Sequence, residues 1–277
     1  MIDALEYFQS LVRQDDSIPL FETGLAIGQI ASPALDLIAV QLEVDKLALR
    51  LRQRLPHDTS DLHKVRMLNH LFYSELGFSP NLNNFYDPDN SYLDRVIASR
   101  RGIPISLAVI YMELAQQIGL DFHGISFPGH FLITLPLSSG SIVLDPLNGN
   151  SLSQGDLEER LLPYLHQGSS GQPAITEILR AASARAILTR MLHNLKAIFL
   201  SERAWPALLA VQQRLVLLQP DDVTERRDRG AAYAMLDCPQ AALPDLEAYL
   251  QKYPRAADAA DIRAQLVHLR SASRGLN

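Results

Sequence analysis

The chain has 277 residues, with 25 Lys and Arg against 31 Asp and Glu and a formal net charge of −6. Apolar residues make up 47% of it, which excludes wholesale disorder, and the acidic balance argues against a general nucleic-acid-binding protein, which needs a basic face. The single cysteine, Cys238, excludes an intrachain disulfide framework and any multi-cysteine metal site.

The amino-terminal part predicts helices and no targeting segment. Apolar residues recur at helical spacing within residues 1–76. The first ten residues have neither a basic start nor an apolar signal core. The longest stretch without charged residues, 122–144, is interrupted by Gly and Pro and does not read as a membrane span. We therefore expect a cytoplasmic protein.

A loop follows, because residues 77–92 are rich in Asn, Pro, Asp and Gly. Four aromatic residues within it predict that it is pinned to the body of the protein: Phe78, Phe85, Tyr86 and Tyr92. A short helix is expected from Leu93 to Arg101.

The most distinctive block is 102–149. Pro104 suits the first turn of a helix, and the residues after it are apolar nearly all round until Gly119, which predicts a buried central helix. Three short apolar runs then predict an antiparallel sheet: 124–127, 130–135 and 141–144. The fold class we predict is α+β and mostly helical, with this helix packed on the small sheet.

The carboxyl-terminal part contains an internal repeat. Pro220 and Pro254 are 34 residues apart, and Gly230 and Ala242 fall in register with the tetratricopeptide pattern. The segment HQGSSGQP at 166–173 is the best domain boundary. We predict amino-terminal helices plus the core over 1–165, a connector over 166–180, and repeat helices over 181–277.

His130 and Asp145 are the candidate site residues. A hairpin that turns midway between Leu137 and Ser138 places positions 130 and 145 directly opposite each other, with neighbouring side chains. A carboxylate beside an imidazole is the base-and-orienter half of a nucleophilic triad. The same pair also serves as a structural hydrogen bond, and these two residues alone leave both interpretations open.

Three motifs occur in order: NSYLDRVIASRRGIPISLAVIYMELAQQIGL, FPGHFLI and LDPLNG. Over roughly residues 20–270 the chain resembles the bacterial SirB family, whose members join a transglutaminase-like core to a tetratricopeptide segment. The resemblance implies a papain- or transglutaminase-like fold with a Cys–His–Asp triad. It matches His130 and Asp145 to the His and Asp, and it places Pro104, which has no nucleophilic side chain, in the Cys position.

The missing cysteine decides the predicted function. Ser106 is two residues on and about 200° around the helix, so it faces away. We predict a non-catalytic transglutaminase-like protein in protein–protein interaction or regulation. The alternative is an active hydrolase or acyltransferase using Ser106 with His130 and Asp145, which requires the Ser106 hydroxyl within hydrogen-bond reach of His130. A third possibility is a small ligand in the cleft.

The expected partner is a protein or peptide, bound by the repeat helices or by the vestigial cleft, with no nucleic acid and no membrane. The oligomeric state is left open. We expect no cofactor and no metal, because the histidines are too few and too widely spaced for a zinc site. An acidic partner is favoured if Arg226, Arg227 and Arg229 point into a concave face of the repeats.

Overall fold

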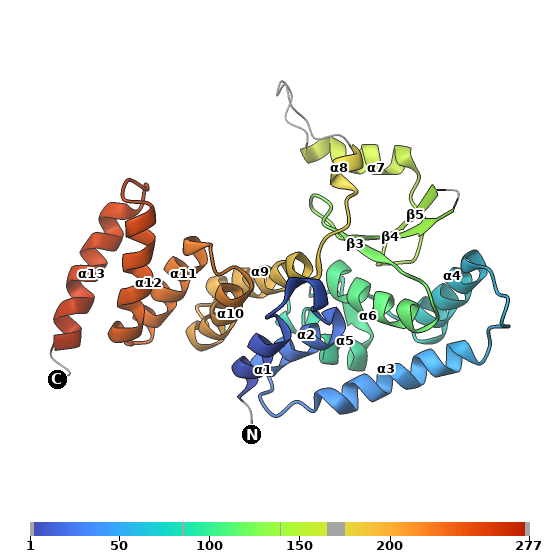
Figure 1. Cartoon of the computed structure of the whole chain (residues 1–277), viewed down its shortest axis with the longest axis horizontal. Coiled ribbons are helices and arrows are strands. Elements are labelled where there is room, and N and C mark those ends of the chain that lie inside the picture. The colour runs from blue at the N-terminus through green and yellow to red at the C-terminus, as the bar shows by residue number, and fades with distance from the viewer. Residues whose placement is uncertain (1–2, 85, 139, 165–174, 275–277) are drawn as a thin grey trace. The chain divides into compact units, whose positions relative to one another are not determined.

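The computed structural model describes residues 3–84, 86–138, 140–164 and 175–274. The chain divides into two compact units (Figure 1). We call residues 18–191 the core unit, and residues 1–17 together with 192–277 the repeat unit. The first 17 residues thus group with the repeat helices, whereas the sequence put them with the core. Residues 165–174, which include most of the predicted connector, lie outside the described residues, so its limits stay a prediction.

The core unit is mostly helical, with a small three-stranded sheet. Its helices are α2 (Leu20–Ile27), α3 (Leu37–Arg52), α4 (Asp61–Asn69), α5 (Leu93–Ser99), α6 (Pro104–Gln117), α7 (Gln154–Leu161) and α8 (Ile175–Ile178). A π-helical turn, His70–Glu75, continues α4, and α9 (Ala184–Glu202) begins in this unit and ends in the other. The predicted α+β, mostly helical class is confirmed.

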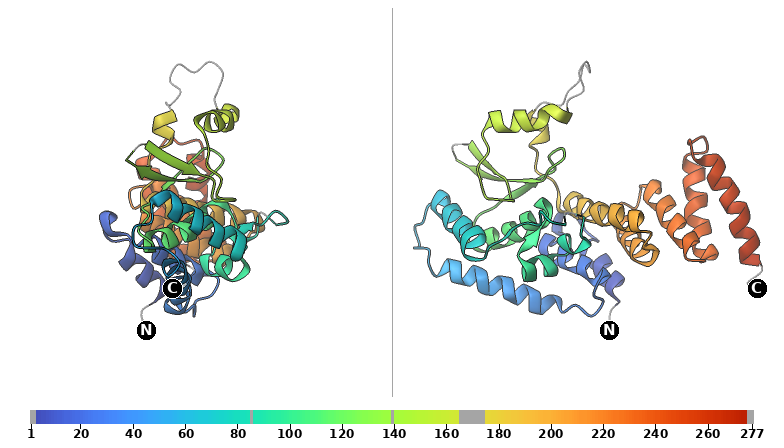
Figure 2. Two further views of the ribbon diagram at one scale, coloured as in Figure 1. Left: turned by 90° about the vertical axis from the view of Figure 1, so that its right-hand side faces the viewer. Right: turned by 180° about the vertical axis from the view of Figure 1, so that it is seen from behind.

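Helix α6 is the centre of the core unit, as predicted. Pro104 is its first residue, which suits proline because the first N–H of a helix has no partner within the helix. The helix is buried on nearly every side and leads to Gly119, whose φ of 77° is the left-handed conformation that glycine accepts. The sheet packs against one side of α6 and α3 against the other (Figure 2).

The sheet is antiparallel in the order β3 (His123–Ile125), β4 (Leu132–Leu137) and β5 (Gly140–Leu144). Apolar residues of its outer face pack under α7 and α8: Ile125, Phe127, Leu132 and Val143 with Leu157, Leu161 and Ile178. The core unit is therefore layered as α3, α6, the sheet, and then α7 with α8.

The predicted hairpin register is wrong by two residues. Leu137 pairs with Gly140 and Ile133 with Leu144, so the turn is centred one position later than predicted. His130 precedes β4 and has no partner in the ladder. Because side chains in a strand alternate with a period of two, an even shift keeps each residue on its expected face.

The loop before α5 is only partly pinned by its aromatic residues. Phe78 is buried and stacks on Phe72 with ring centroids 4.2 Å apart, and Tyr92 is also buried. Tyr86, in contrast, is 77% exposed, and Phe85 lies outside the described residues. Helix α5 ends at Ser99, two residues earlier than predicted, because the next residue adopts a left-handed φ of 61°. Two short strands, β1 (Ser79–Pro80) and β2 (Arg101–Gly102), then pair in parallel.

The repeat unit is helical and matches the tetratricopeptide pattern. Its helices are α1 (Ala4–Leu11), the end of α9, α10 (Trp205–Leu218), α11 (Val223–Met235), α12 (Pro239–Lys252) and α13 (Ala259–Arg274). Gly230 lets α11 approach α12 closely, since a Cβ there would lie 2.9 Å from Leu246 and 3.2 Å from the Ala242 carbonyl. Helix α1 packs on α10, with Phe8 fully buried.

Candidate functional site

His130 is held in a turn between β3 and β4. Its backbone N–H donates to the Phe127 carbonyl (3.1 Å), and Gly129 adopts a left-handed φ of 65°. Arg190 of α9 donates to the carbonyls of both Phe127 and His130, at 2.7 Å for the latter. Hydrogen bonds within the turn and from Arg190 therefore hold the backbone of His130, and this backbone position determines where its imidazole begins.

Asp145 directly follows β5 and begins a tight loop. Its backbone N–H donates to the Asn150 carbonyl (2.9 Å), and its own carbonyl accepts from the Gly149 N–H (2.8 Å). Gly149 has a φ of 74°, and a Cβ at this position would lie 2.4 Å from the Tyr73 ring. The loop geometry therefore requires glycine at position 149.

Helix α4 and the π-helical turn after it hold this loop. Tyr73 donates its hydroxyl to the Pro146 carbonyl, and Asn69 donates its amide to the Gly149 carbonyl, each at 3.0 Å. The Tyr111 hydroxyl on α6 donates to the Asn69 side-chain oxygen (2.8 Å). Burial, with the nearby Tyr111 and Asp145, raises the pKa of Tyr73 far above its usual value, so Tyr73 stays a neutral donor.

The two candidate residues contact each other. His130 Nε2 lies 3.0 Å from Asp145 Oδ1, which also accepts the Leu147 N–H (3.0 Å), while Oδ2 accepts from Arg160 of α7 (2.8 Å). Burial alone raises the pKa of Asp145, but the hydrogen bonds from His130, Arg160 and Leu147 outweigh it and bring the pKa to about 2. The ionised carboxylate fixes the proton of His130 on Nε2, which leaves Nδ1 as the basic nitrogen.

Ser106 faces away from this pair. Its side chain is completely buried, its Oγ accepts the Ile103 N–H (3.1 Å), and its hydroxyl donates to the Asn90 carbonyl (2.6 Å). Among the described residues, no hydrogen bond joins Ser106 to His130. The contact that the alternative function required is therefore not made, because this hydroxyl caps the first turn of α6.

Sequence reasoning missed Arg160, Tyr73 and Asn69. Arg160 lies on α7, which packs over the outer face of the sheet, and nothing in its local sequence connects it to Asp145. Tyr73 and Asn69 belong to a segment that read only as a helix with an apolar face. Asp145 is only 3% exposed, and a buried carboxylate needs several hydrogen-bond donors. The sequence alone does not show that Asp145 is buried, so these donors could not be expected.

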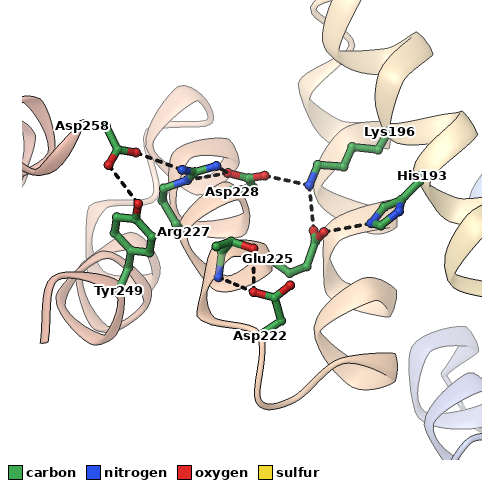
Figure 3. Close-up of polar contacts among 9 residues, drawn as sticks. His193, Lys196, Asp222, Glu225, Arg227, Asp228, Tyr249 and Asp258 are labelled. Carbon is green, nitrogen blue, oxygen red and sulfur yellow. Dashed lines mark hydrogen bonds and ion pairs between the residues drawn. The ribbon is translucent and has the colours of Figure 1, made fainter. Parts of the chain in front are cut away.

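The repeat unit holds a second candidate surface, a line of polar contacts that joins α9, α11, α12 and the turn before α13 (Figure 3). Glu225 of α11, 5% exposed, lies between two residues of α9, His193 (2.9 Å) and Lys196 (2.7 Å). Lys196 also contacts Asp228 (2.7 Å). Burial raises the pKa of Glu225, but the two partners on α9 outweigh it and lower the pKa overall.

The line continues toward α12 and α13. Arg227 contacts Asp228 at 2.7 Å and Asp258 at 2.9 Å, and Asp258 accepts the Tyr249 hydroxyl at 2.9 Å. We call the residues from His193 to Asp258 in this line the polar ladder: His193, Lys196, Glu225, Arg227, Asp228, Tyr249 and Asp258. The charged residues of the ladder alternate in sign, so we expect the ladder to stabilise the stacking of the repeat helices.

The arginines of α11 do not form an unpaired basic face. Arg226 and Arg229 both contact the buried carboxylate of Asp245, at 3.1 and 2.6 Å, and Arg227 belongs to the polar ladder. The condition that favoured an acidic partner is therefore not met, because acidic residues of the repeat unit itself neutralise these side chains.

Within the described ranges, no group of three or more His, Cys, Asp or Glu side chains is arranged to hold a metal ion. No helix in the described part of the chain has the length and apolar character to span a membrane.

Comparison with known proteins gives two family models. Residues 38–193 match a model described as transglutaminase-like superfamily, and residues 195–267 match one described as tetratricopeptide repeat. No solved structure matches the chain significantly.

Proteins from several bacteria are similar to most of the chain. A UPF0162 protein of Xylella fastidiosa is 37% identical over 256 residues, which cover 92% of this chain and 91% of the relative. A UPF0162 protein of Vibrio cholerae is 30% identical over 91% of this chain and 92% of its own, and Protein SirB1 of Salmonella typhimurium is 28% identical over 81% and 82%. With its transglutaminase-like core, its tetratricopeptide helices and relatives named UPF0162 protein and SirB1, the chain belongs to the SirB family.

Proposed function

We propose that this protein is a non-catalytic member of the transglutaminase-like superfamily that acts by binding a protein partner. The observation that carries the proposal is the start of α6, where Pro104 occupies the position that the family resemblance assigns to the nucleophilic Cys. The nearest hydroxyl in sequence, that of Ser106, is buried in the cap of α6. In this proposal the described residues at the start of α6 offer His130 and Asp145 no nucleophile to activate.

In this proposal His130 and Asp145 have a structural role. Asp145 uses both of its oxygens to join the turn at 127–130, its own loop and Arg160 of α7. Such a network connects two loops and a helix that are distant in sequence. Removal of one member leaves buried polar groups unsatisfied, which is costly in free energy.

The partner-binding part of the proposal rests on the repeat unit. Tetratricopeptide helices stack into surfaces suited to extended peptides or helices. A groove between α12 and α13 has a volume of about 470 Å³ and an apolar wall that includes Leu250, Leu266 and Val267, the last 65% exposed. The partner proposed for this groove is a protein segment with apolar side chains.

Two measurements test the proposal. The first assays amide hydrolysis and acyl transfer on peptide substrates, and we expect no turnover above the blank. Turnover that disappears in a His130→Ala variant would refute a non-catalytic function.

The second measurement is cross-linked capture of a partner by the full chain, compared with two charge-introducing variants. Val267→Asp alters the repeat groove, while Ile38→Asp alters an equally exposed site of the core unit, 73% exposed. We expect the same captured protein with wild type and Ile38→Asp, and a severalfold loss with Val267→Asp. Equal capture by all three contradicts the groove as the partner site.

A further inference from the structure

Helix α3 forms one outer layer of the core unit and packs on α6 and α2 (Figure 2). Four of its residues are buried: Val44, Leu47, Ala48 and Leu51. Three large apolar side chains of the same helix are exposed: Ile38 by 73%, Leu42 by 50% and Leu49 by 50%. No other α-helix in the described part of the core unit exposes more than one large apolar side chain. Helix α3 therefore has two apolar faces, of which the core unit covers one.

The exposed residues form a single row, which we call the α3 stripe: Ile38, Leu42 and Leu49. A helix turns about 100° per residue, so these three side chains point within about 40° of one another. Asp45 also lies in this sector, but the side-chain amides of two glutamines donate to it (3.0 and 2.8 Å) and it is half-buried. An exposed apolar row along one helix is typical of a surface that another protein covers.

The charges of α3 indicate which protein fits the stripe. The acidic residues stand at the beginning and in the middle of the helix: Asp36, Glu43 and Asp45. The basic residues all follow them: Lys46, Arg50 and Arg52. A second copy of the helix that runs in the opposite direction therefore places its basic half against the acidic half of the first, and the converse. Such self-complementarity is the condition for an interface between two identical chains.

Two of these charges are available for such a contact. Lys46 is exposed and makes no hydrogen bond or ion pair with any described residue. The side chain of Glu43 is 50% exposed and, among the described residues, contacts Arg100 alone, at 3.3 Å. Lys46 and Glu43 lie on the same side of the α3 stripe, because both are displaced from Leu42 in the same rotational sense around the helix.

We propose that this protein forms a two-fold dimer through α3. The two helices pack in opposite directions, with Ile38 of each copy opposite Leu49 of the other and both Leu42 side chains between these ends. A two-fold axis brings the same side of both helices together. In this register Glu43 lies two residues, about 3 Å along the helix, from the position opposite Lys46 of the second copy. The apolar contact and the ion pair are thus each made twice.

The first test is the mass of the full chain by sedimentation equilibrium at rising protein concentration. One helix from each copy gives a small interface, so we expect the mass to rise from that of one chain to that of two in the micromolar range. Ile38→Asp buries a carboxylate against an apolar residue in both contacts, which should raise the dissociation constant at least about tenfold. A wild type that stays one chain at every concentration, or an Ile38→Asp variant that dimerises like wild type, overturns the proposal.

The second test exchanges the charges at the predicted ion pair. Lys46→Glu and Glu43→Lys each place like charges at both contacts, so each variant alone should dimerise at least about tenfold more weakly than wild type. In an equal mixture, a chain with two glutamates meets a chain with two lysines, and both contacts then join opposite charges. We expect the mixture to recover the wild-type affinity within about threefold. A mixture that dimerises as weakly as the separate variants refutes the antiparallel register.

A cross-linking experiment replaces the mixture if Glu43→Lys fails to fold. A carbodiimide, which condenses a carboxylate and an amine into an amide, is applied to the wild type at a concentration where it is dimeric. The joined chains should yield two copies of the same peptide linked through Glu43 and Lys46. Joined chains without this linkage contradict the register.

The dimer is separate from the proposed partner binding, because α3 belongs to the core unit and the α12–α13 groove to the repeat unit. Ile38→Asp should lose the dimer and keep partner capture, whereas Val267→Asp, the same kind of change at an exposed residue of the groove, should keep the dimer and lose capture. Loss of the dimer in Val267→Asp, with full association of Ile38→Asp, would place the interface in the repeat unit and overturn the α3 dimer.

Discussion

Arg160 Nη1 lies 2.8 Å from Asp145 Oδ2, while the other oxygen of the same carboxylate contacts His130. The carboxylate thus faces two cationic or potentially cationic donors, and it is almost completely buried. This arrangement connects α7 to both loops of the candidate site. The strength of these hydrogen bonds depends on the ionisation of Asp145, so a change of pH or a neutral substitution at position 145 tests their contribution.

Asp145→Asn is expected to destabilise the protein in a pH-dependent way. The folded-state pKa is lowered from 3.8 to about 2, so the ionised group stabilises the fold above about pH 4, and this contribution disappears as the pH falls through 2. This lowering of the pKa corresponds to about 2 kcal/mol of folding free energy at pH 7. Thermal unfolding of wild type and variant at pH 7 and pH 3 measures it.

The control for that experiment is Asp121→Asn, because Asp121 is 88% exposed. It should unfold like wild type at both pH values. An Asp145→Asn variant as stable as wild type at pH 7 would show that the network around Asp145 does not contribute to stability.

Pro104→Cys is expected to produce a reactive thiol. If position 104 is the vacant Cys position, a thiol there gains from the amino terminus of α6 and from His130, both of which stabilise a thiolate. In a Cys238→Ser background the new thiol is the only one in the chain. Its alkylation at pH 7 should be about tenfold faster than that of Cys238 in the wild type.

The control asks whether the alkylation rate of the thiol at position 104 depends on His130. Adding His130→Ala to the Pro104→Cys variant should slow alkylation severalfold and leave only the contribution of the amino terminus of α6. A rate that is ordinary from the start, or that ignores His130, means that position 104 does not face the imidazole.

Glu225→Gln should destabilise the repeat unit. The change removes a buried charge that His193 and Lys196 hold, at a cost of about 2 kcal/mol. Because the pKa of Glu225 is lowered in the fold, its contribution is present at neutral pH and declines below about pH 4.5. Trp205, the single tryptophan, lies at the start of α10 and reports unfolding of this unit by fluorescence.

Glu247→Gln is the matched control, since Glu247 forms an exposed ion pair with Arg270 in the same unit. Exposed pairs contribute little, so this variant should unfold like wild type. Equal unfolding midpoints for Glu225→Gln and Glu247→Gln would contradict a stabilising polar ladder.

Gly149→Ala is expected to disturb the Asp145 loop. The left-handed backbone and the contact with Tyr73 both oppose a side chain, which together cost about 2 kcal/mol or more. Gly155→Ala serves as the comparison, because a Cβ there meets nothing closer than Ser153 Oγ at 3.8 Å and α7 favours alanine. Amide hydrogen exchange of β5 should accelerate only in the first variant.

Local sequence patterns were enough to predict the central helix, the three strands and the contact between His130 and Asp145. The hairpin register was wrong because apolar runs fix which face a residue takes but not where the turn begins; Gly140 extended β5 by one residue. The contact with Asp145 is made from the turn before β4 and not from a ladder position, so the wrong register did not remove it. Arg160 could not be predicted, since its position depends on how α7 crosses the sheet.

The arginines of α11 illustrate a different limit. A run of three arginines in four positions is equally compatible with a binding face and with internal ion pairs. The deciding residue is Asp245, 2% exposed on the neighbouring helix, and the sequence alone does not reveal that it is buried between them.

The polar ladder also has a consequence for how a partner would arrive at the repeat unit. Its cationic side chains each face a carboxylate, and Arg270 in the α12–α13 groove faces Glu247. Such a surface exerts little long-range attraction on a charged molecule, so encounter would proceed without electrostatic steering. Association rates should therefore change little between low and physiological ionic strength, and selectivity would depend on the fit of apolar side chains after contact.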